Sequence, residues 1–112
     1  MTQVIFFKDS EHNYVGFSVS GHSGYGIEGE DIVCAALSSC TELILNTLDE
    51  FGISYETEID PERAFVKCMA SKSENNKLSC DTLSRIIASF YRTVCDIEKE
   101  YRGYVKCIVT EV

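Results

Sequence analysis

Basic residues are scarce in this 112-residue chain. Lysine and arginine together number 10, against 18 aspartate and glutamate residues, so the formal net charge is −8 and the isoelectric point is near 4.6. Proteins that bind bare nucleic acid or anionic lipid surfaces depend on clusters of lysine and arginine. The charge therefore argues against direct nucleic-acid binding and against a membrane-surface role, whereas an acidic surface suits a basic peptide partner.

Long hydrophobic runs and a leader pattern are also missing. The N-terminal eight residues hold only a four-residue apolar run, Val4 to Phe7, with no basic segment before it. No run approaches the ~20 residues of a membrane-spanning helix. We therefore expect a cytoplasmic protein without a membrane partner. The length predicts a single domain over residues 1–112 that buries a core without help from disulfides or metals.

Cys-x-x-Cys pairs are absent, although the chain has six cysteines. Their absence weakens zinc and redox-motif hypotheses, and no metal or cofactor is expected. In a reducing compartment the thiols are expected to stay free and mostly buried as small hydrophobic groups. Cys40, Cys68 and Cys107 fall on apolar faces, where we expect core positions.

The hydrophobic pattern switches between strand and helix periods. Residues 4–7 and 14–20 predict a β-hairpin, residues 53–59 and 64–70 predict two strands around the only proline, and residues 105–109 predict a last strand. Helices are predicted from Asp31 to about Phe51, and from near Ser79 or Asp81 to Tyr101. The first helix carries an apolar stripe: Val33, Ala36, Leu37, Cys40, Ile44, Leu48 and Phe51. The order ββαββαβ predicts an α+β fold of two layers, one mixed or largely antiparallel sheet with both helices on one face.

A glycine-rich loop separates a histidine from a cysteine. Four of the seven glycines lie within residues 21–30, and they are Gly21, Gly24, Gly26 and Gly29. Cys34 follows in the first turn of the predicted helix, where free N–H groups and the helix dipole favour a thiolate. Because the loop must fold back, His22 can approach Cys34 and accept its proton. Ser38, one turn later, can donate a hydrogen bond to the sulfur.

Each of these residues also has a purely structural interpretation. A cysteine near a helix start is more often a small core residue than a nucleophile. Asp31 is a good helix cap, and Ser38 can satisfy a backbone carbonyl. Glu28 and Glu30 form either a solvated edge or an acidic rim that attracts a basic peptide.

The segment from residue 21 to residue 38 closely resembles the ribosomal-processing cysteine protease family, Prp. That family carries a Gly-His motif, a glycine-containing loop, the run Asp-Ile-Val-Cys-Ala-Ala and a serine. The corresponding residues here are Gly21-His22, Gly29, Asp31-Ile32-Val33-Cys34-Ala35-Ala36 and Ser38. Ser23 and Leu37 stand where alanine and valine are expected. The resemblance extends to the length of the chain and the order of its elements.

The resemblance implies a cysteine endopeptidase with Cys34 as nucleophile and His22 as general base. It implies supporting roles for Gly21, Asp31 and Ser38, and a flexible flap that contains Gly24, Gly26 and Gly29. It also implies a homodimer that removes the N-terminal extension of a large-subunit ribosomal protein, the twenty-seventh, by cleavage after a pair of phenylalanines.

Two details of this chemistry follow from the residues around the loop. Backbone N–H groups at the helix start are candidates to hold the oxyanion. Tyr25 and Ile27 are the nearby candidates for a phenylalanine pocket.

Two other functions remain open at this point. A non-catalytic ribosome-assembly or adaptor domain would use the same loop for binding. A thiol-dependent redox enzyme would use Cys34 with Cys40 as resolving thiol. Six residues at ~100° per residue place those two cysteines on roughly opposite sides of a helix, which disfavours the redox hypothesis.

Overall fold

The computed structural model describes residues 1–112 and confirms the α+β class and the order ββαββαβ. The strands are β1 (Thr2–Lys8), β2 (Tyr14–Ser20), β3 (Tyr55–Asp60), β4 (Phe65–Ala70) and β5 (Val105–Glu111), and the helices are α1 (Ile32–Glu50) and α2 (Lys77–Glu100). A short 3-10 turn, Pro61–Arg63, joins β3 to β4. The elements therefore follow the predicted order, with ends that differ by a few residues.

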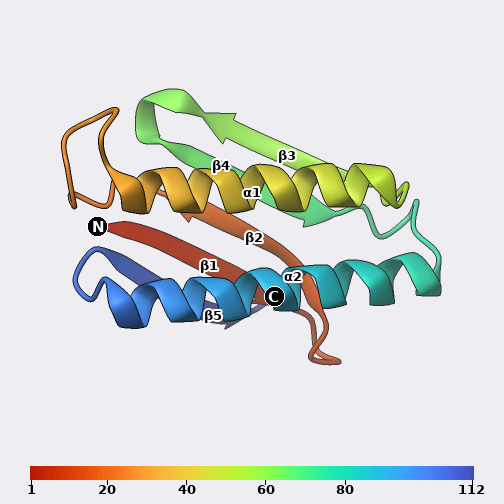
Figure 1. Ribbon diagram of the computed structural model, residues 1–112. Helices are drawn as coiled ribbons and strands as arrows, with labels where there is room; N and C mark the ends of the chain where they lie inside the picture. Colours follow the sequence, from red (N-terminus) through yellow and green to blue (C-terminus); the bar gives the residue numbers. More distant parts are fainter.

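One five-stranded sheet, in the order β3-β4-β2-β1-β5, carries both helices on the same face (Figure 1). β1 pairs antiparallel with β2, β2 with β4, and β3 with β4. Only β5 runs parallel to its neighbour, β1, because α2 carries the chain across the sheet before β5 begins. The sheet is therefore mixed, as predicted.

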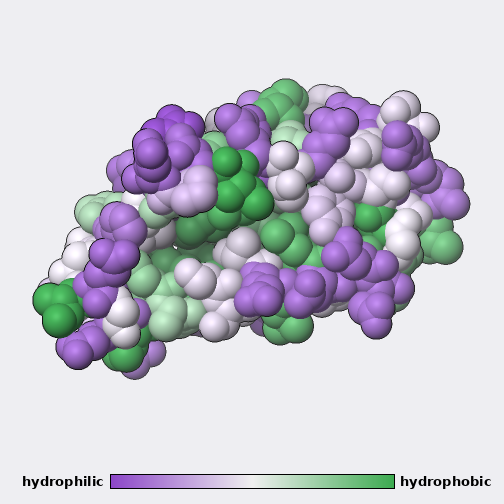
Figure 2. All heavy atoms as spheres, turned by 90° about the horizontal axis from the view of Figure 1, so that it is seen from above, coloured by the Kyte–Doolittle hydropathy of each residue, from purple (hydrophilic) through white to green (hydrophobic).

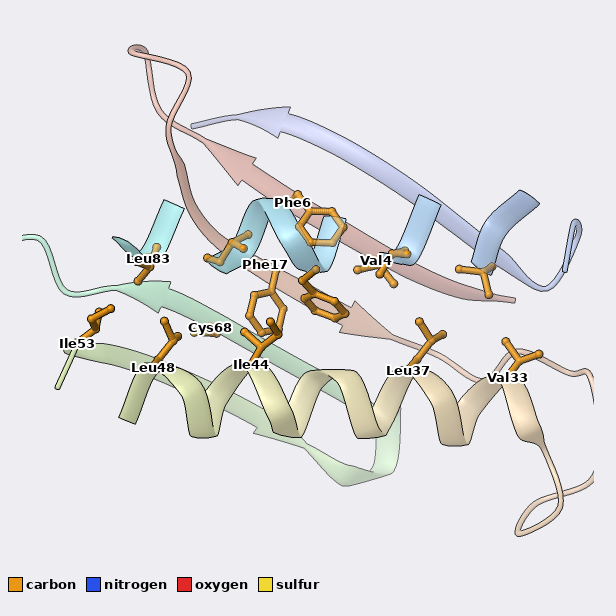
Figure 3. Packing of buried hydrophobic residues seen from close by; sticks show 14 residues of the cluster. Val4, Phe6, Phe17, Val33, Leu37, Ile44, Leu48, Ile53, Cys68 and Leu83 are labelled. Atoms are coloured by element: carbon orange, nitrogen blue, oxygen red, sulfur yellow. The ribbon is translucent and has the colours of Figure 1, made fainter. Parts of the chain in front are cut away.

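Aromatic rings from the central strands fill the space beneath the helices. Phe6 of β1 lies opposite Phe17 of β2, so both side chains point to the helix side of the sheet. The edges of Phe90 and Tyr91 from α2 meet the Phe6 ring at centroid distances of 5.4 Å. Figure 3 shows the α1 side chains, among them Leu37 and Leu48, pointing into the same core.

The buried stripe of α1 differs in part from the predicted one. Its buried residues are Val33, Leu37, Thr41, Ile44 and Leu48. Thr41 tolerates burial because its hydroxyl donates to the carbonyl of Leu37 at 2.8 Å. Ala36 is exposed and Phe51 is 64% exposed, so their core assignment was wrong; Cys40 is only half-buried against the core.

By length and composition, α1 is also the one helix that could cross a membrane. The core helix of a soluble protein can satisfy the same criterion. In this fold α1 places Val33, Leu37, Ile44 and Leu48 in the hydrophobic core shared with the sheet and α2. Its apolar character therefore has a structural use inside the domain.

The second helix begins earlier than predicted. Asn76, rather than Ser79 or Asp81, caps α2, because its side-chain oxygen accepts the N–H of Ser79 at 2.8 Å. Its buried residues recur at three- and four-residue spacing, and they are Leu83, Ile87, Phe90 and Val94. Of the three cysteines expected in the core, Cys68 is fully buried, whereas Cys40 and Cys107 are half-buried.

We predict that Phe6→Ala lowers the free energy of unfolding much more than Phe51→Ala does. Phe6 is fully buried, so its truncation leaves a cavity and lowers the free energy of unfolding by about 3–5 kcal/mol. Phe51→Ala, at an exposed position, changes it by about 0.5 kcal/mol or less. Urea unfolding of both variants measures the difference. Equal costs would contradict the burial assigned to these rings.

Candidate active site

The carboxylate of Asp31 joins the glycine loop to the start of α1. One oxygen, Oδ1, accepts the backbone N–H groups of Val33 and Cys34, each at 3.0 Å. The other, Oδ2, accepts the Ser23 hydroxyl at 2.5 Å and the Gly26 N–H at 3.2 Å. Asp31 is therefore the N-cap of the helix, as the sequence suggested, and also holds the loop against it.

These donors keep Asp31 ionised. The Ser23 hydroxyl has the largest effect, and the N–H groups of Cys34 and Gly26 add to it, so the pKa of the Asp31 carboxyl lies well below its usual range. Hydrogen bonds that favour the charged form shift a pKa in this direction. The negative charge is buried, since Asp31 is only 8% exposed, but four donors satisfy it.

Ser23 is a residue whose role the sequence analysis missed. It is 2% exposed, its hydroxyl donates to Asp31 and accepts the N–H of Tyr25 at 3.1 Å, and its own N–H donates to the sulfur of Cys34 at 3.3 Å. The one available signal was its departure from the expected alanine. Here the added hydroxyl links the loop, the helix cap and the thiol.

Gly21 sets the start of the loop. Its φ of +85° lies in the left-handed region that favours glycine, and a Cβ there would meet the carbonyl oxygen of Met1 at 3.0 Å. Its N–H donates to the carbonyl of Ala64 at 3.2 Å, which ties the end of β2 to the start of β4. The neighbouring His22 is thereby placed just beyond the end of β2, the central strand of the sheet.

An apolar cleft of about 490 Å³ lies between α1 and the sheet. Its hydrophobic lining includes Val19, Leu37, Leu45, Ile59, Phe65 and Val66. Ile59, on the edge strand β3, is 62% exposed. Figure 2, seen from above, shows hydrophobic residues lining a hollow towards one end of the molecule.

A second cleft of about 370 Å³ lies on the other side of the thiol, beneath the glycine loop. Its wall is formed by Gly24, Gly26, Glu28, Gly29 and Asp31 together with Ala35. Three side chains, those of His22, Cys34 and Ser38, line both clefts. The structure therefore brings the three residues together at the junction of an apolar and a polar cleft.

No hydrogen bond joins the histidine to the thiol in this structure. His22 is exposed and Cys34 is half-buried. Ser38 is exposed and makes no hydrogen bond to the sulfur. The one hydrogen-bond donor to the sulfur is the backbone N–H of Ser23.

Three backbone N–H groups at the helix start already have hydrogen-bond partners. The N–H groups of Val33 and Cys34 both donate to the Asp31 side chain, and the N–H of Ala35 donates to the Asp31 carbonyl at 3.0 Å. Because the cap uses these donors, they are not available to a substrate. These three N–H groups therefore do not fit the expected oxyanion role.

The two expected pocket residues also lie elsewhere. Tyr25 packs edge-on against Tyr101 and Tyr104, at centroid distances of 5.2 and 5.1 Å, and Ile27 is 69% exposed. Neither side chain lines a cleft beside Cys34. Tyr25 instead attaches the loop to the connection between α2 and β5, at the same end of the molecule (Figure 1).

The acidic and thiol groups of the chain do not gather around a common centre. No cluster of three or more histidine, cysteine, aspartate or glutamate side chains has the arrangement needed to hold a metal ion. Cys40 is half-buried and lines neither cleft. The site is thus built around a single thiol.

Comparison with known proteins places this site in a family. Residues 1–106 match the family model described as cysteine protease Prp. The chain belongs to this family. Since the match extends over nearly the whole chain, it includes the glycine loop, both helices and the segment around Cys34. A comparison with curated protein sequences finds no match.

Solved structures share the Prp fold at low sequence identity. The ribosomal processing protease Prp from S. aureus, solved with a covalently linked product peptide, has a TM-score of 0.85 and 19% identity over 98% of this chain and 100% of that chain. The same protease with a substrate peptide has a TM-score of 0.81 and 18% identity over the same shares of the two chains. SMU.848 from Streptococcus mutans has a TM-score of 0.82 and 20% identity over 100% of this chain and 96% of that chain.

We predict that Asp31→Asn lowers the melting temperature at neutral pH. The difference in melting temperature between the variant and the wild type is expected to narrow as the pH falls. An amide retains a cap oxygen but turns an NH₂ group towards the donors Ser23 and Gly26. With the folded-state pKa of Asp31 lowered, its carboxylate stabilises the fold above the unfolded pKa of about 4, and this contribution declines as the pH falls towards the folded pKa.

Thermal melting of both proteins between about pH 7 and about pH 3 measures this gap. Glu50→Gln, a matched change at an exposed carboxylate, is the control and is expected to leave the melting curve almost unchanged. A gap for Asp31→Asn that stays constant over this range would contradict the bonding network described here.

Proposed function

We propose that the protein is a cysteine endopeptidase that removes the N-terminal extension of a ribosomal protein precursor. The observation that carries the proposal is the placement of Cys34, which lies at the junction of two clefts and shares both with His22. A peptide chain that crosses this junction would present its carbonyl groups to the thiol. Membership of the Prp family supports the same chemistry.

The proposed mechanism uses Cys34 and His22 as a dyad. His22 accepts the thiol proton, the sulfur attacks the scissile carbonyl, and His22 then protonates the departing amine. Water, activated by the same imidazole, releases the acyl group and regenerates the thiol. His22 is exposed and has no hydrogen-bond partner, so its ring is free to turn towards the sulfur once a peptide is bound.

The environment of the sulfur supports this role. The N–H of Ser23 points at the sulfur of Cys34 from 3.3 Å, and an N–H donor interacts more strongly with a thiolate than with a thiol. Cys34 itself lies in the first turn of α1, at the positive end of the helix dipole. Asp31 in turn holds both Ser23 and this first turn in place.

The two clefts suggest how a substrate is recognised. In the S. aureus protease Prp, structures with a substrate peptide and with a covalently linked product peptide have been solved. We propose that the apolar cleft here receives a pair of phenylalanines before the cut bond, in an extension of the twenty-seventh large-subunit ribosomal protein. Its apolar walls, among them Val66 and Phe65, suit aromatic side chains.

Acidic side chains border both clefts. Glu42 lies at the apolar cleft and Glu28 at the polar cleft, in a protein of net charge −8. Such an arrangement attracts the basic peptides that are typical of ribosomal proteins. The glycine loop carries Glu28, and we propose that it acts as a flap that moves when a peptide binds. The proposal further places the protein in the cytoplasm as a homodimer, without direct nucleic-acid contact.

We predict that Cys34→Ala abolishes cleavage and leaves the fold intact. The variant removes the nucleophile, whereas the helix cap depends on the backbone N–H of residue 34 and not on its sulfur. The measurement is incubation with a peptide that spans the precursor extension and its junction, followed by mass spectrometry. Cys40→Ala, a matched change at a half-buried thiol outside both clefts, is expected to retain activity per folded molecule.

Other outcomes would separate the remaining hypotheses. Cleavage by purified Cys34→Ala would overturn the nucleophile assignment. Tight peptide binding by wild type without any cleavage would favour the adaptor function. Loss of activity in Cys40→Ala, with formation of a Cys34–Cys40 disulfide in wild type, would favour a redox enzyme.

A further inference from the structure

A second pair of sulfur atoms lies outside the proposed active site. Cys95 of α2 and Cys107 of β5 place their Sγ atoms 4.0 Å apart, and both residues are half-buried. They are the only two of the six cysteines whose sulfur atoms are in contact. The contact joins a helix to an edge strand rather than neighbours within one element, so it depends on the tertiary fold.

The local structure allows these sulfurs to approach bonding distance. A disulfide requires an S–S separation of about 2.05 Å, so the atoms must move together by about 2 Å. β5 is an edge strand that pairs only with β1, which leaves its outer side free to shift. The Cys107 N–H already donates to Oε2 of Glu98 at 2.7 Å, which keeps the end of α2 close to β5.

We propose that Cys95 and Cys107 form an oxidation site, at which hydrogen peroxide converts the two thiols into a disulfide that ties α2 to β5. In the first step the Cys95 sulfur attacks one peroxide oxygen, the O–O bond breaks, and a sulfenic acid and hydroxide form. In the second step the Cys107 sulfur attacks the Cys95 sulfur, the S–O bond breaks, and water leaves. The two thiols lose two electrons and two protons, and peroxide is reduced to two waters.

The surroundings assign the order of these steps. Burial, reinforced by the adjacent Cys95, raises the pKa of Cys107 to about 12, so Cys107 stays protonated at neutral pH. The thiolate is the form that reacts with peroxide. Cys107 is therefore disfavoured for the first step, which leaves that step to Cys95 and the role of resolving thiol to Cys107. The neighbouring Cys95 is the main reason that the pKa of Tyr91 is raised to about 12.

The bond would act on the connection that supports the glycine loop. The chain between Cys95 and Cys107 contains Tyr101 and Tyr104, the two rings that hold Tyr25. A disulfide would close this segment into a covalent ring and restrict the movement of both tyrosines. The packing that holds the loop beside Cys34 would thus depend on the redox state of Cys95 and Cys107. A dithiol reductant would restore the two free thiols.

The test is peptide mapping of the folded, full-length Cys34→Ala protein, in which the active-site thiol cannot compete. After treatment with hydrogen peroxide, free thiols are blocked with iodoacetamide and the protein is digested with trypsin without reduction. Trypsin cuts after Arg92, Lys99 and Lys106, so residues 93–99 and 107–112 become separate peptides. Only a disulfide holds them together. The expected product is this linked pair, lighter by two hydrogens than its parts and separated by dithiothreitol.

Cys80 provides the matched control, because it is half-buried on α2 but has no sulfur neighbour, and its peptide, residues 78–85, is distinct. It is expected to stay out of any disulfide in the folded protein and to join mixed disulfides only when the same treatment is carried out in denaturant. Cys95→Ser is expected to abolish the linked pair. The proposal is overturned if Cys95 and Cys107 are recovered as separate blocked peptides at a peroxide dose that oxidises Cys80, or if links to Cys80 form equally in the folded protein.

Discussion

The arrangement around the thiol depends on one buried carboxylate. Asp31 accepts four hydrogen bonds, two from the first turn of α1 and two from the glycine loop. Since the same group fixes the helix start and the loop, Cys34 and Ser23 have a fixed relation to each other. A neutral or shorter side chain at this position would satisfy the helix or the loop, but not both.

The fold brings the side chains of the site together at the two clefts. β2 delivers His22 to the end of the sheet, and α1 delivers Cys34 and Ser38, so three side chains from two elements border the same two clefts. The apolar cleft lies between α1 and residues of β2, β3 and β4, and the polar cleft lies between the glycine loop and the start of α1. Tyr25 attaches the glycine loop to the rest of the domain, because it packs against the connection between α2 and β5.

Local signals predicted the elements and the position of the thiol well. Asp31 before an apolar stripe marked the helix start, and Gly21-His22 and Cys34 marked the two ends of the loop. Tertiary details were beyond such signals. Thr41 tolerates burial because its hydroxyl donates to a carbonyl within its own helix, whereas Phe51, at the C-cap just past the last helical residue, is exposed. The walls of the apolar cleft come from five separate elements, β1, β2, α1, β3 and β4, so no sequence spacing revealed them.

The central claim is that His22 accepts the proton of the Cys34 thiol. The rate of Cys34 alkylation tests this claim most directly. Iodoacetamide labelling of the folded protein, followed by mass spectrometry of the peptide that contains Cys34, reports how readily this sulfur reacts at neutral pH. His22→Ala is compared with His12→Ala, which alters the other histidine, in the turn between β1 and β2. The account predicts slower labelling and loss of peptide cleavage in His22→Ala, with both unchanged in His12→Ala. Equal labelling and equal cleavage in the two variants would contradict it.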